Sequence, residues 1–351
     1  MDTSAAKPEA QGSWYRETPG PLPLSKVMHD VENRIANGHT ARFRPMLTGF
    51  TPLDEVLGGG IRPGELMILG GPYGVGKTIF ALQIARNAVY NDPHTRALYV
   101  CYEHDRTHLM SRLICLESAA QPETGESLTL RKLAQLTFRG LENPGLIAQL
   151  RREPRYKPFI QALDTYADRL ILSKASGTYS TLQEIETWVQ AYMTPETEQV
   201  LLIVDYLQKI PVDRELWQTE DEVTTHLTHG LKEMALSKGI QVIGIAASDR
   251  LGLRAKRMRL ADLRGSSALQ YEADIGIMLN NKHDIVSREH LVYNLAQAGA
   301  MRNWIVVSVE KNRAGFHAVD MEFAIDAPHF RIVPKGDFVR ERLVDEKVVL
   351  K

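Results

Sequence analysis

The sequence predicts an α/β fold in which a mostly parallel, twisted sheet is flanked by helices. Residues 71–78 read GPYGVGKT and fit the pattern G-x-x-x-x-G-K-[ST], between an apolar run and a helical pattern over 79–89. Strand-like aliphatic runs alternate with helical patterns along the rest of the chain, which favours parallel strands covered on both faces. These runs are 65–69, 97–102, 200–204, 241–246, 275–279 and 304–309. Such a sheet binds ligands at the carboxyl ends of its strands.

The composition is typical of one large folded domain. The chain has 351 residues, 44% of them hydrophobic, and a net charge of −1, which neither supports nor excludes nucleic acid. Two cysteines, Cys101 and Cys115, are too few for a disulfide framework, so we expect a reducing compartment, the cytoplasm. No segment has the pattern of a signal peptide or a transmembrane span, and no membrane partner is expected.

Four segments are expected along the chain: a flexible tail over 1–22, a linker helix within 23–45, the folded domain over 46–335 and a tail over 336–351. Ser25 is placed to cap the helix. Apolar residues recur at helical spacing in it, at Leu24, Val27, Met28, Val31 and Ile35. This helix either packs on its own domain or docks on a neighbouring subunit.

Residues 116–168 are rich in Leu, Gln, Arg and Glu, and the sequence predicts a mostly helical excursion between the second and third strand-like runs.

The loop at 71–78 has the residue types that a triphosphate site needs. Gly71, Gly74 and Gly76 allow the backbone N–H groups to turn inward at a helix N-terminus. Lys77 would reach the terminal phosphates, and Thr78 would offer its hydroxyl to Mg²⁺.

Two acids follow neighbouring strand-like runs. Asp205 closes the run 200–204 and can hold Mg²⁺ through water, opposite Thr78. Glu103 follows the run 97–102 and would reach the same edge of the sheet, where a carboxylate can act as general base toward water. The plainer interpretation of Glu103 is a solvated turn residue.

Basic residues gather in two places. Lys311 and Arg313 stand two apart after the last run, so they face the same way and could serve an anion on the same chain, an anion on a neighbour, or water. The segment from 250 to 264 is either a solvated face or a grip for nucleic-acid phosphates. Its basic residues are Arg250, Arg254, Lys256, Arg257, Arg259 and Arg264.

Taken together, these motifs resemble the DnaB family of ring helicases, over roughly residues 24–335. The matching segments are TGFTPLD at 48–54, VDYLQ at 204–208, DLRGS at 262–266 with EAD at 272–274, and KNRAG at 311–315. The resemblance implies a RecA-like P-loop NTPase motor domain.

The resemblance also implies roles and partners. ATP and Mg²⁺ would bind at Lys77, Thr78 and Asp205, Glu103 would activate water, and Arg313 with Lys311 would complete the neighbouring subunit's site. It implies a homohexameric ring on single-stranded DNA, whose basic loop at 250–264 carries the strand. It leaves open a primase, a loader or a separate collar protein as a further partner. No counterpart of the family's collar domain, which helps to form the ring and recruits primase, is expected before the linker helix.

Two positions depart from the family pattern. Ala247 stands where the family has a sensor glutamine, and alanine cannot hydrogen-bond a phosphate. Gly265 replaces a glutamate. An alternative is therefore a KaiC-type, RadA-type or degenerate DnaB-like module that assembles with ATP without unwinding. A small-molecule kinase would leave the paired cations and the basic run unexplained.

Overall fold

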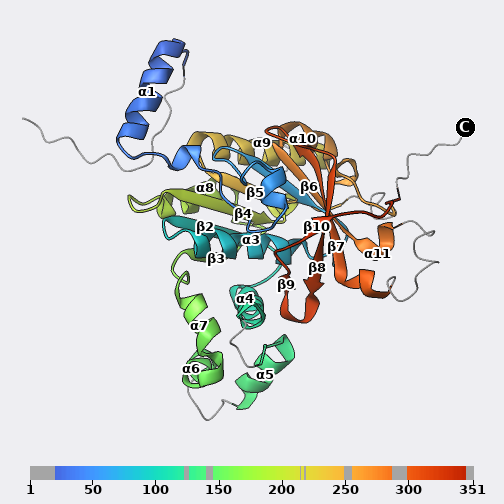
Figure 1. The fold of residues 1–351 in the computed structure, drawn as a ribbon. Coiled ribbons are helices and arrows are strands. Elements are labelled where there is room, and N and C mark those ends of the chain that lie inside the picture. The colour runs from blue at the N-terminus through green and yellow to red at the C-terminus, as the bar shows by residue number, and fades with distance from the viewer. Residues whose placement is uncertain are drawn as a thin grey trace, which may run out of the picture.

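A computed structural model of the protein describes residues 20–121, 126–139, 145–213, 215–216, 219–248, 255–286 and 299–344. The tail expected over 1–22 lies outside these ranges up to residue 19. The described residues form a central sheet with helices on both of its faces (Figure 1).

The sheet has the strand order β10-β8-β7-β6-β1-β5-β4-β2-β3, with β9 paired to β8. All neighbours from β6 to β3 are parallel, whereas β7, β8 and β10 run antiparallel to their neighbours. The strands are β1 (Leu66–Gly70), β2 (Thr95–Cys101), β3 (Leu170–Lys174), β4 (Gln199–Asp205), β5 (Gln241–Ile245), β6 (Ile275–Asn281), β7 (Trp304–Asn312), β8 (Val319–Asp326), β9 (Arg331–Ile332) and β10 (Asp337–Phe338). The predicted fold class and all six predicted strand runs are confirmed.

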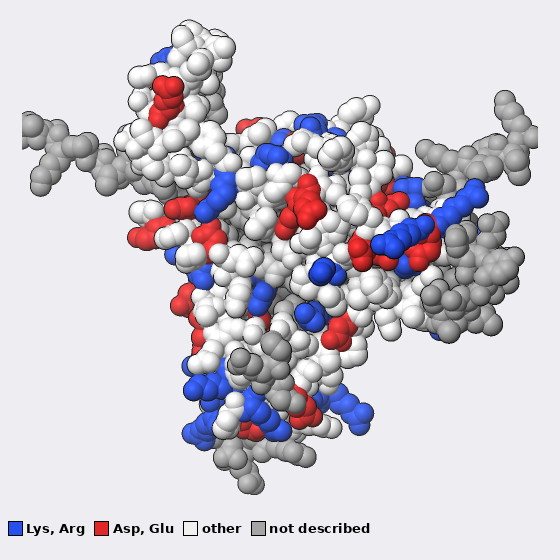
Figure 2. All heavy atoms as spheres, viewed as in Figure 1, with Lys and Arg blue, Asp and Glu red and all other residues white. Residues whose placement is uncertain are grey.

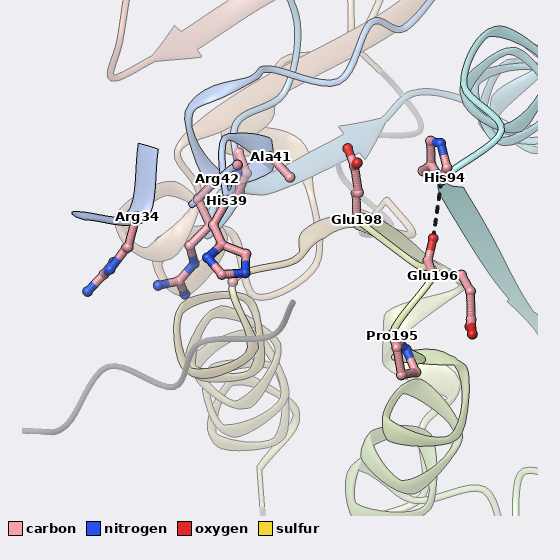
Figure 3. A pocket seen from close by; sticks show the side chains of 11 residues that line it. Arg34, His39, Ala41, Arg42, His94, Pro195, Glu196 and Glu198 are labelled. Carbon is pink, nitrogen blue, oxygen red and sulfur yellow. Dashed lines mark hydrogen bonds between the residues drawn. The ribbon is translucent and has the colours of Figure 1, made fainter. Parts of the chain in front are cut away.

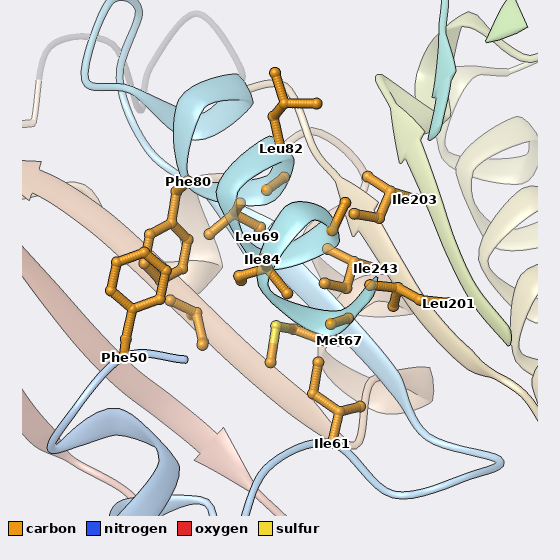
Figure 4. Close-up of a cluster of buried hydrophobic side chains, with 14 of the residues drawn as sticks. Phe50, Ile61, Met67, Leu69, Phe80, Leu82, Ile84, Leu201, Ile203 and Ile243 are labelled. Carbon is orange, nitrogen blue, oxygen red and sulfur yellow. The ribbon is translucent and has the colours of Figure 1, made fainter. Parts of the chain in front are cut away.

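Two apolar clusters pack the faces of the sheet, because alternate residues of each buried strand point to opposite sides. Phe50, Phe80 and Ile84 pack with Leu69 and Ile243 on one face (Figure 4). Helices α8, α9 and α10 cover the other face. The helices are α1 (Leu24–Ala36), α2 (Leu53–Val56), α3 (Lys77–Asn91), α4 (Arg106–Ala120), α5 (Leu130–Arg139), α6 (Leu146–Arg152), α7 (Lys157–Asp164), α8 (Leu182–Tyr192), α9 (Glu220–Lys238), α10 (Ser266–Glu272) and α11 (Lys282–Ile285).

None of the helices within the described ranges is long and apolar enough to cross a bilayer.

The expected helical excursion is present as α4 to α7, with a small apolar cluster of its own. A buried ion pair fixes it to α3: Arg86 donates to both oxygens of Glu117, the second at 2.8 Å, and the Tyr166 hydroxyl donates to Glu117 Oε1 at 2.7 Å. Glu117 is fully buried. Lys and Arg side chains gather over the end of the excursion that lies farthest from the sheet (Figure 2).

Helix α1 projects from the body and buries none of its residues (Figure 1). Leu24, Met28 and Ile35 are half exposed or more, so the apolar stripe is present and lacks a partner among the described residues of this chain. The prediction that Ser25 caps the helix is wrong. The helix begins at Leu24, after Pro23, which gives no side-chain hydrogen bond.

The prediction that the C-terminal tail begins at residue 336 is wrong, because the residues that follow are part of the fold. Strand β10 pairs with β8, and Leu343 forms a bridge with Val286. Glu341 accepts a hydrogen bond of 2.8 Å from the buried Lys282. Residues 337–344 therefore belong to the folded domain.

Candidate nucleotide-binding site

The loop at 71–78 connects the end of β1 to the start of α3. Gly71 and Gly76 have φ angles of 146° and 105°, which disfavour any residue with a side chain. A Cβ at Gly71 would also lie 2.4 Å from the Leu279 carbonyl oxygen. The backbone therefore turns here as an anion cradle requires, at the N-terminus of a 15-residue helix.

Lys77 turns back into this loop. Its ammonium donates to the carbonyl oxygens of Gly71 at 2.7 Å and Pro72 at 2.9 Å, and the residue is only 5% exposed. Burial lowers the pKa of Lys77 to about 8, against the opposing effect of the Asp205 and Glu103 carboxylates. A phosphate in the cradle would offer this cation a stronger partner than the two carbonyls.

Asp205 connects β4 to the start of α3. Its Oδ2 accepts hydrogen bonds of 2.8 Å from both the Thr78 hydroxyl and the Tyr99 hydroxyl. Its Oδ1 is buried and accepts no hydrogen bond from the described residues. Burial raises the pKa of this carboxyl group. A free carboxylate oxygen beside a threonine hydroxyl fits Mg²⁺, which prefers hard oxygen ligands and keeps several waters.

Glu103 lies at the same edge. Cys101, two residues earlier, pairs with Asp205 across β2 and β4. Glu103 is exposed, and its charge contributes to the pKa values of both Lys77 and Asp205, for which burial is the largest influence. The structure therefore brings Glu103, Lys77, Thr78 and Asp205 together.

Lys311 and Arg313 lie at the opposite edge of the sheet. Strand β7 is antiparallel to β6, and Asn312 pairs with Ile275, the first residue of β6. Arg313 donates to Asp274 Oδ1 at 3.2 Å and to the Tyr271 carbonyl at 2.6 Å, while Lys311 donates to the Tyr271 carbonyl at 3.2 Å. The length of β1, about 16 Å, separates these cations from the phosphate loop of their own chain.

The basic run at 250–264 is only partly described, and Arg250 and Arg254 lie outside the described residues. Arg259 is bound to Glu310 at 3.1 Å, and Arg264 pairs with Glu220. Lys256 also has a partner within the molecule.

The prediction that Arg257 contacts nucleic-acid phosphates is wrong. Arg257 is 5% exposed and donates to Asp320 and, at 3.2 Å, to Ser308. Its guanidinium is therefore buried beside β7 and β8 and is not available to a nucleic acid.

A hollow of about 330 Å³ is separate from the phosphate loop (Figure 3). Arg34 and Arg42 lie on one side of it, and Glu196 and Glu198 lie on the other. Its walls include the segments just before β1, β2, β4 and β5, so it lies at the amino edge of the parallel strands. The phosphate loop lies at the carboxyl edge.

Two residues that contact the predicted site residues are not predicted by the sequence motifs. The first is Tyr99, whose hydroxyl donates to Asp205; a buried tyrosine usually finds a partner for its hydroxyl, and that is the signal the sequence offers. Asp274 anchors Arg313 and also accepts from the Leu66 N–H at 2.8 Å and from Lys232 at 2.7 Å. No local pattern predicts these contacts between distant segments.

Comparison with known proteins assigns a family. The model of the DnaB-like helicase C-terminal domain matches residues 46–331. Similar curated proteins include the replicative DNA helicase DnaB of Rickettsia bellii (strain RML369-C), 29% identical over 76% of this chain and 51% of the relative. The DnaB helicase of Geobacillus stearothermophilus is 26% identical over 65% of this chain and 45% of its own length. The chain thus spans about half the length of these relatives.

Two solved structures share the fold. One is an isolated ATPase domain, with a TM-score of 0.68 at 19% identity, and the match covers 90% of this chain and 99% of that one. The other is a DnaB-like replicative helicase, solved in a study of its interactions with primase. It has a TM-score of 0.63 at 19% identity, over 90% of this chain and 67% of that one.

Proposed function

Because this chain belongs to the DnaB-like helicase family, we propose that it is an ATP-hydrolysing motor that moves along single-stranded DNA as a ring. ATP with Mg²⁺ is the fuel, and each hydrolysis site is shared by two copies of the chain. A primase, a loader or a separate collar protein are the partners that this proposal includes.

The position of Arg313 is the observation that carries the proposal. Arg313 and Lys311 lie at the amino edge of the parallel strands, and Lys77 lies at the carboxyl edge. Head-to-tail packing of identical copies brings one edge of a protomer against the other edge of the next, and such contacts close into rings. Lys311 and Arg313 of one copy, the finger cations, then reach the phosphates that its neighbour holds.

The residues divide the chemistry among them. Glu103 accepts a proton from the attacking water, and Lys77 and the neighbour's Arg313 stabilise the negative charge that develops on the transferred phosphoryl group. Thr78 and Asp205 hold Mg²⁺, which when bound offsets charge on the phosphates.

Helix α1 supplies a second contact between copies in this proposal. An apolar groove of about 230 Å³ lies between α4, α6 and α7, and its lining includes Leu113 and Ile160. In this proposal the groove of a neighbouring copy receives the exposed apolar stripe that contains Met28. Met28→Glu should lower the mass of the assembly measured by light scattering, whereas Asn33→Glu, on the polar side of α1, should not. Equal masses would remove α1 from the interface.

A second candidate, an ATP-dependent assembly module that unwinds nothing, is favoured by Ala247. This position follows β5 and has no side chain that could sense a phosphate. A 71-residue segment of this chain is 42% identical to the DNA repair protein RadA of Mycobacterium tuberculosis (strain CDC 1551 / Oshkosh), over 20% of this chain.

Steady-state ATP hydrolysis with and without single-stranded DNA, at two salt concentrations, tests the proposal. The motor predicts stimulation by DNA that weakens as salt rises, because phosphate contacts are screened. Lys77→Ala should abolish turnover in every condition. Basal hydrolysis that ignores DNA would favour the assembly module.

A further inference from the structure

Residues 247 and 248, which precede the basic run, contact its last residues, 263 and 264, and these contacts form a neck. Ser248 and Leu263 form an antiparallel bridge, and the Arg264 N–H donates to the Ala247 carbonyl at 3.1 Å. The chain therefore leaves β5 and returns to α10 through one closed point.

Gln208 holds the two sides of the neck together from the short 3-10 helix Leu207–Lys209, which follows β4. Its Oε1 accepts from the Ala247 N–H at 3.0 Å, and its Nε2 donates to the Arg264 carbonyl at 3.3 Å. Gln208 stands three residues after Asp205, so one short segment holds both the candidate metal ligand and the neck.

Glu310 holds the returning part of the run. Its carboxylate accepts from the Leu260 N–H at 2.7 Å and from Arg259 at 3.1 Å, in a half-buried position where charged hydrogen bonds are stronger than at the surface. Glu310 precedes Lys311 directly in β7. The run is therefore tied to the strand that carries the finger cations.

We propose that Gln208 and Glu310 are positioning residues that couple the basic run to two nucleotide sites. Gln208 connects it to the site of its own chain through Asp205, and Glu310 connects it to the neighbour's site through Lys311 and Arg313. The inference deepens the proposed function and rests on its shared site. Coupling between sites is carried by contiguous contacts, and these four hydrogen bonds connect the run to the segment after Asp205 and to β7.

Hydrogen exchange at backbone amides 247–264 of the full chain tests this without using DNA. Binding of the non-hydrolysable analogue AMP-PNP with Mg²⁺ should change the exchange rate in this segment several-fold. Gln208→Met and Glu310→Gln should each reduce the change at least about twofold, and the double variant should remove it, with nucleotide affinity kept within about threefold. Both replacements keep the side-chain size, and Glu310→Gln keeps an acceptor for the Leu260 N–H.

The matched control is Glu186→Gln, which alters an ion pair with Lys238 on another part of the surface and should leave the nucleotide response intact. A double variant with the wild-type response, or a wild-type segment that ignores the nucleotide, would overturn the inference. A wild-type segment that responds to nucleotide while hydrolysis ignores single-stranded DNA would support the inference and contradict the proposed motor.

Discussion

Arg313 donates to Asp274 Oδ1 over 3.2 Å, while the other oxygen of that carboxylate accepts from Lys232 at 2.7 Å. Arg313 is half exposed, so its ion pair contributes at most about 1 kcal/mol. When Arg313 turns to a neighbour, Asp274 still keeps Lys232 as its partner. The finger can therefore leave its own chain at low cost.

Nucleotide affinity should depend on pH through Lys77. Burial lowers the pKa of this ammonium to about 8 in the free protein, and bound phosphates raise it. The bound state then holds the proton more tightly, so affinity is constant below pH 8 and falls above it by up to about tenfold per pH unit.

Calorimetric titration of nucleotide from pH 7 to pH 9.5 measures this fall. Lys77→Arg keeps a positive charge over this whole range, so the nucleotide affinity of this variant should not fall as the pH rises. A wild-type affinity that stays flat across the range would contradict the assignment of Lys77 to the phosphates.

Asp205→Asn should lower ATP hydrolysis by about 100-fold or more, because the metal loses an anionic ligand at the reacting phosphates. The same change should raise the unfolding temperature of the nucleotide-free protein at neutral pH. Burial raises the pKa of Asp205, so its ionised form costs stability above that pKa, and asparagine removes the cost. Scanning calorimetry and a hydrolysis assay on one sample measure both effects. An Asp205→Asn variant that hydrolyses ATP at the wild-type rate would show that Asp205 is not part of the site.

The basic run and the buried Arg257 should respond differently to substitution. Arg254→Glu combined with Lys256→Glu should weaken single-stranded DNA binding at least about tenfold and reduce its salt dependence by one to two phosphate contacts. Arg257→Ala should instead destabilise the fold by about 2 kcal/mol, since it leaves Asp320 without its partner. Fluorescence anisotropy at several salt concentrations and thermal melts separate the two. DNA affinity unchanged in the double variant would exclude this segment.

Glu117→Ala should destabilise the protein by about 3–5 kcal/mol, because it leaves the Arg86 guanidinium and the Tyr166 hydroxyl without their buried partner. Glu186→Ala, which removes the ion pair with Lys238 at the surface, should cost less than about 1 kcal/mol. Urea unfolding gives both free energies. Similar values for the two variants would mean that the excursion is not fixed to α3 by this pair.

The sequence could predict the parallel core but not the complete sheet. Buried strands such as β4 are continuous aliphatic runs, which composition alone reveals. Strand β3 is a short edge strand with only Leu170 buried, so it lacks that signal. Strand β8 has its signal in another form: Met321 and Phe323 are buried while Asp320 and Glu322 alternate with them, which is the pattern of a half-covered antiparallel strand.

The candidate site was predictable where one segment contains the chemistry. The loop at 71–78 and Asp205 are each recognised from a motif of a few consecutive residues, although Asp205 contacts Thr78 across 127 residues of the sequence. Gln208, Glu310 and Asp274 act through contacts 39 to 208 residues away, and no local pattern contains such information. Arg257 looked like surface charge because its partner Asp320 lies 63 residues away.

The most direct test of a site shared between copies is ATP hydrolysis by a mixture of Arg313→Ala and Glu103→Ala proteins. Each variant alone should hydrolyse ATP at a small fraction of the wild-type rate. In an equal mixture that exchanges subunits, an intact site of one variant meets an intact finger of the other at about a quarter of the interfaces, and the rate should rise toward that fraction. A mixture no more active than its two components, or an Arg313→Ala protein as active as wild type, would contradict the shared site.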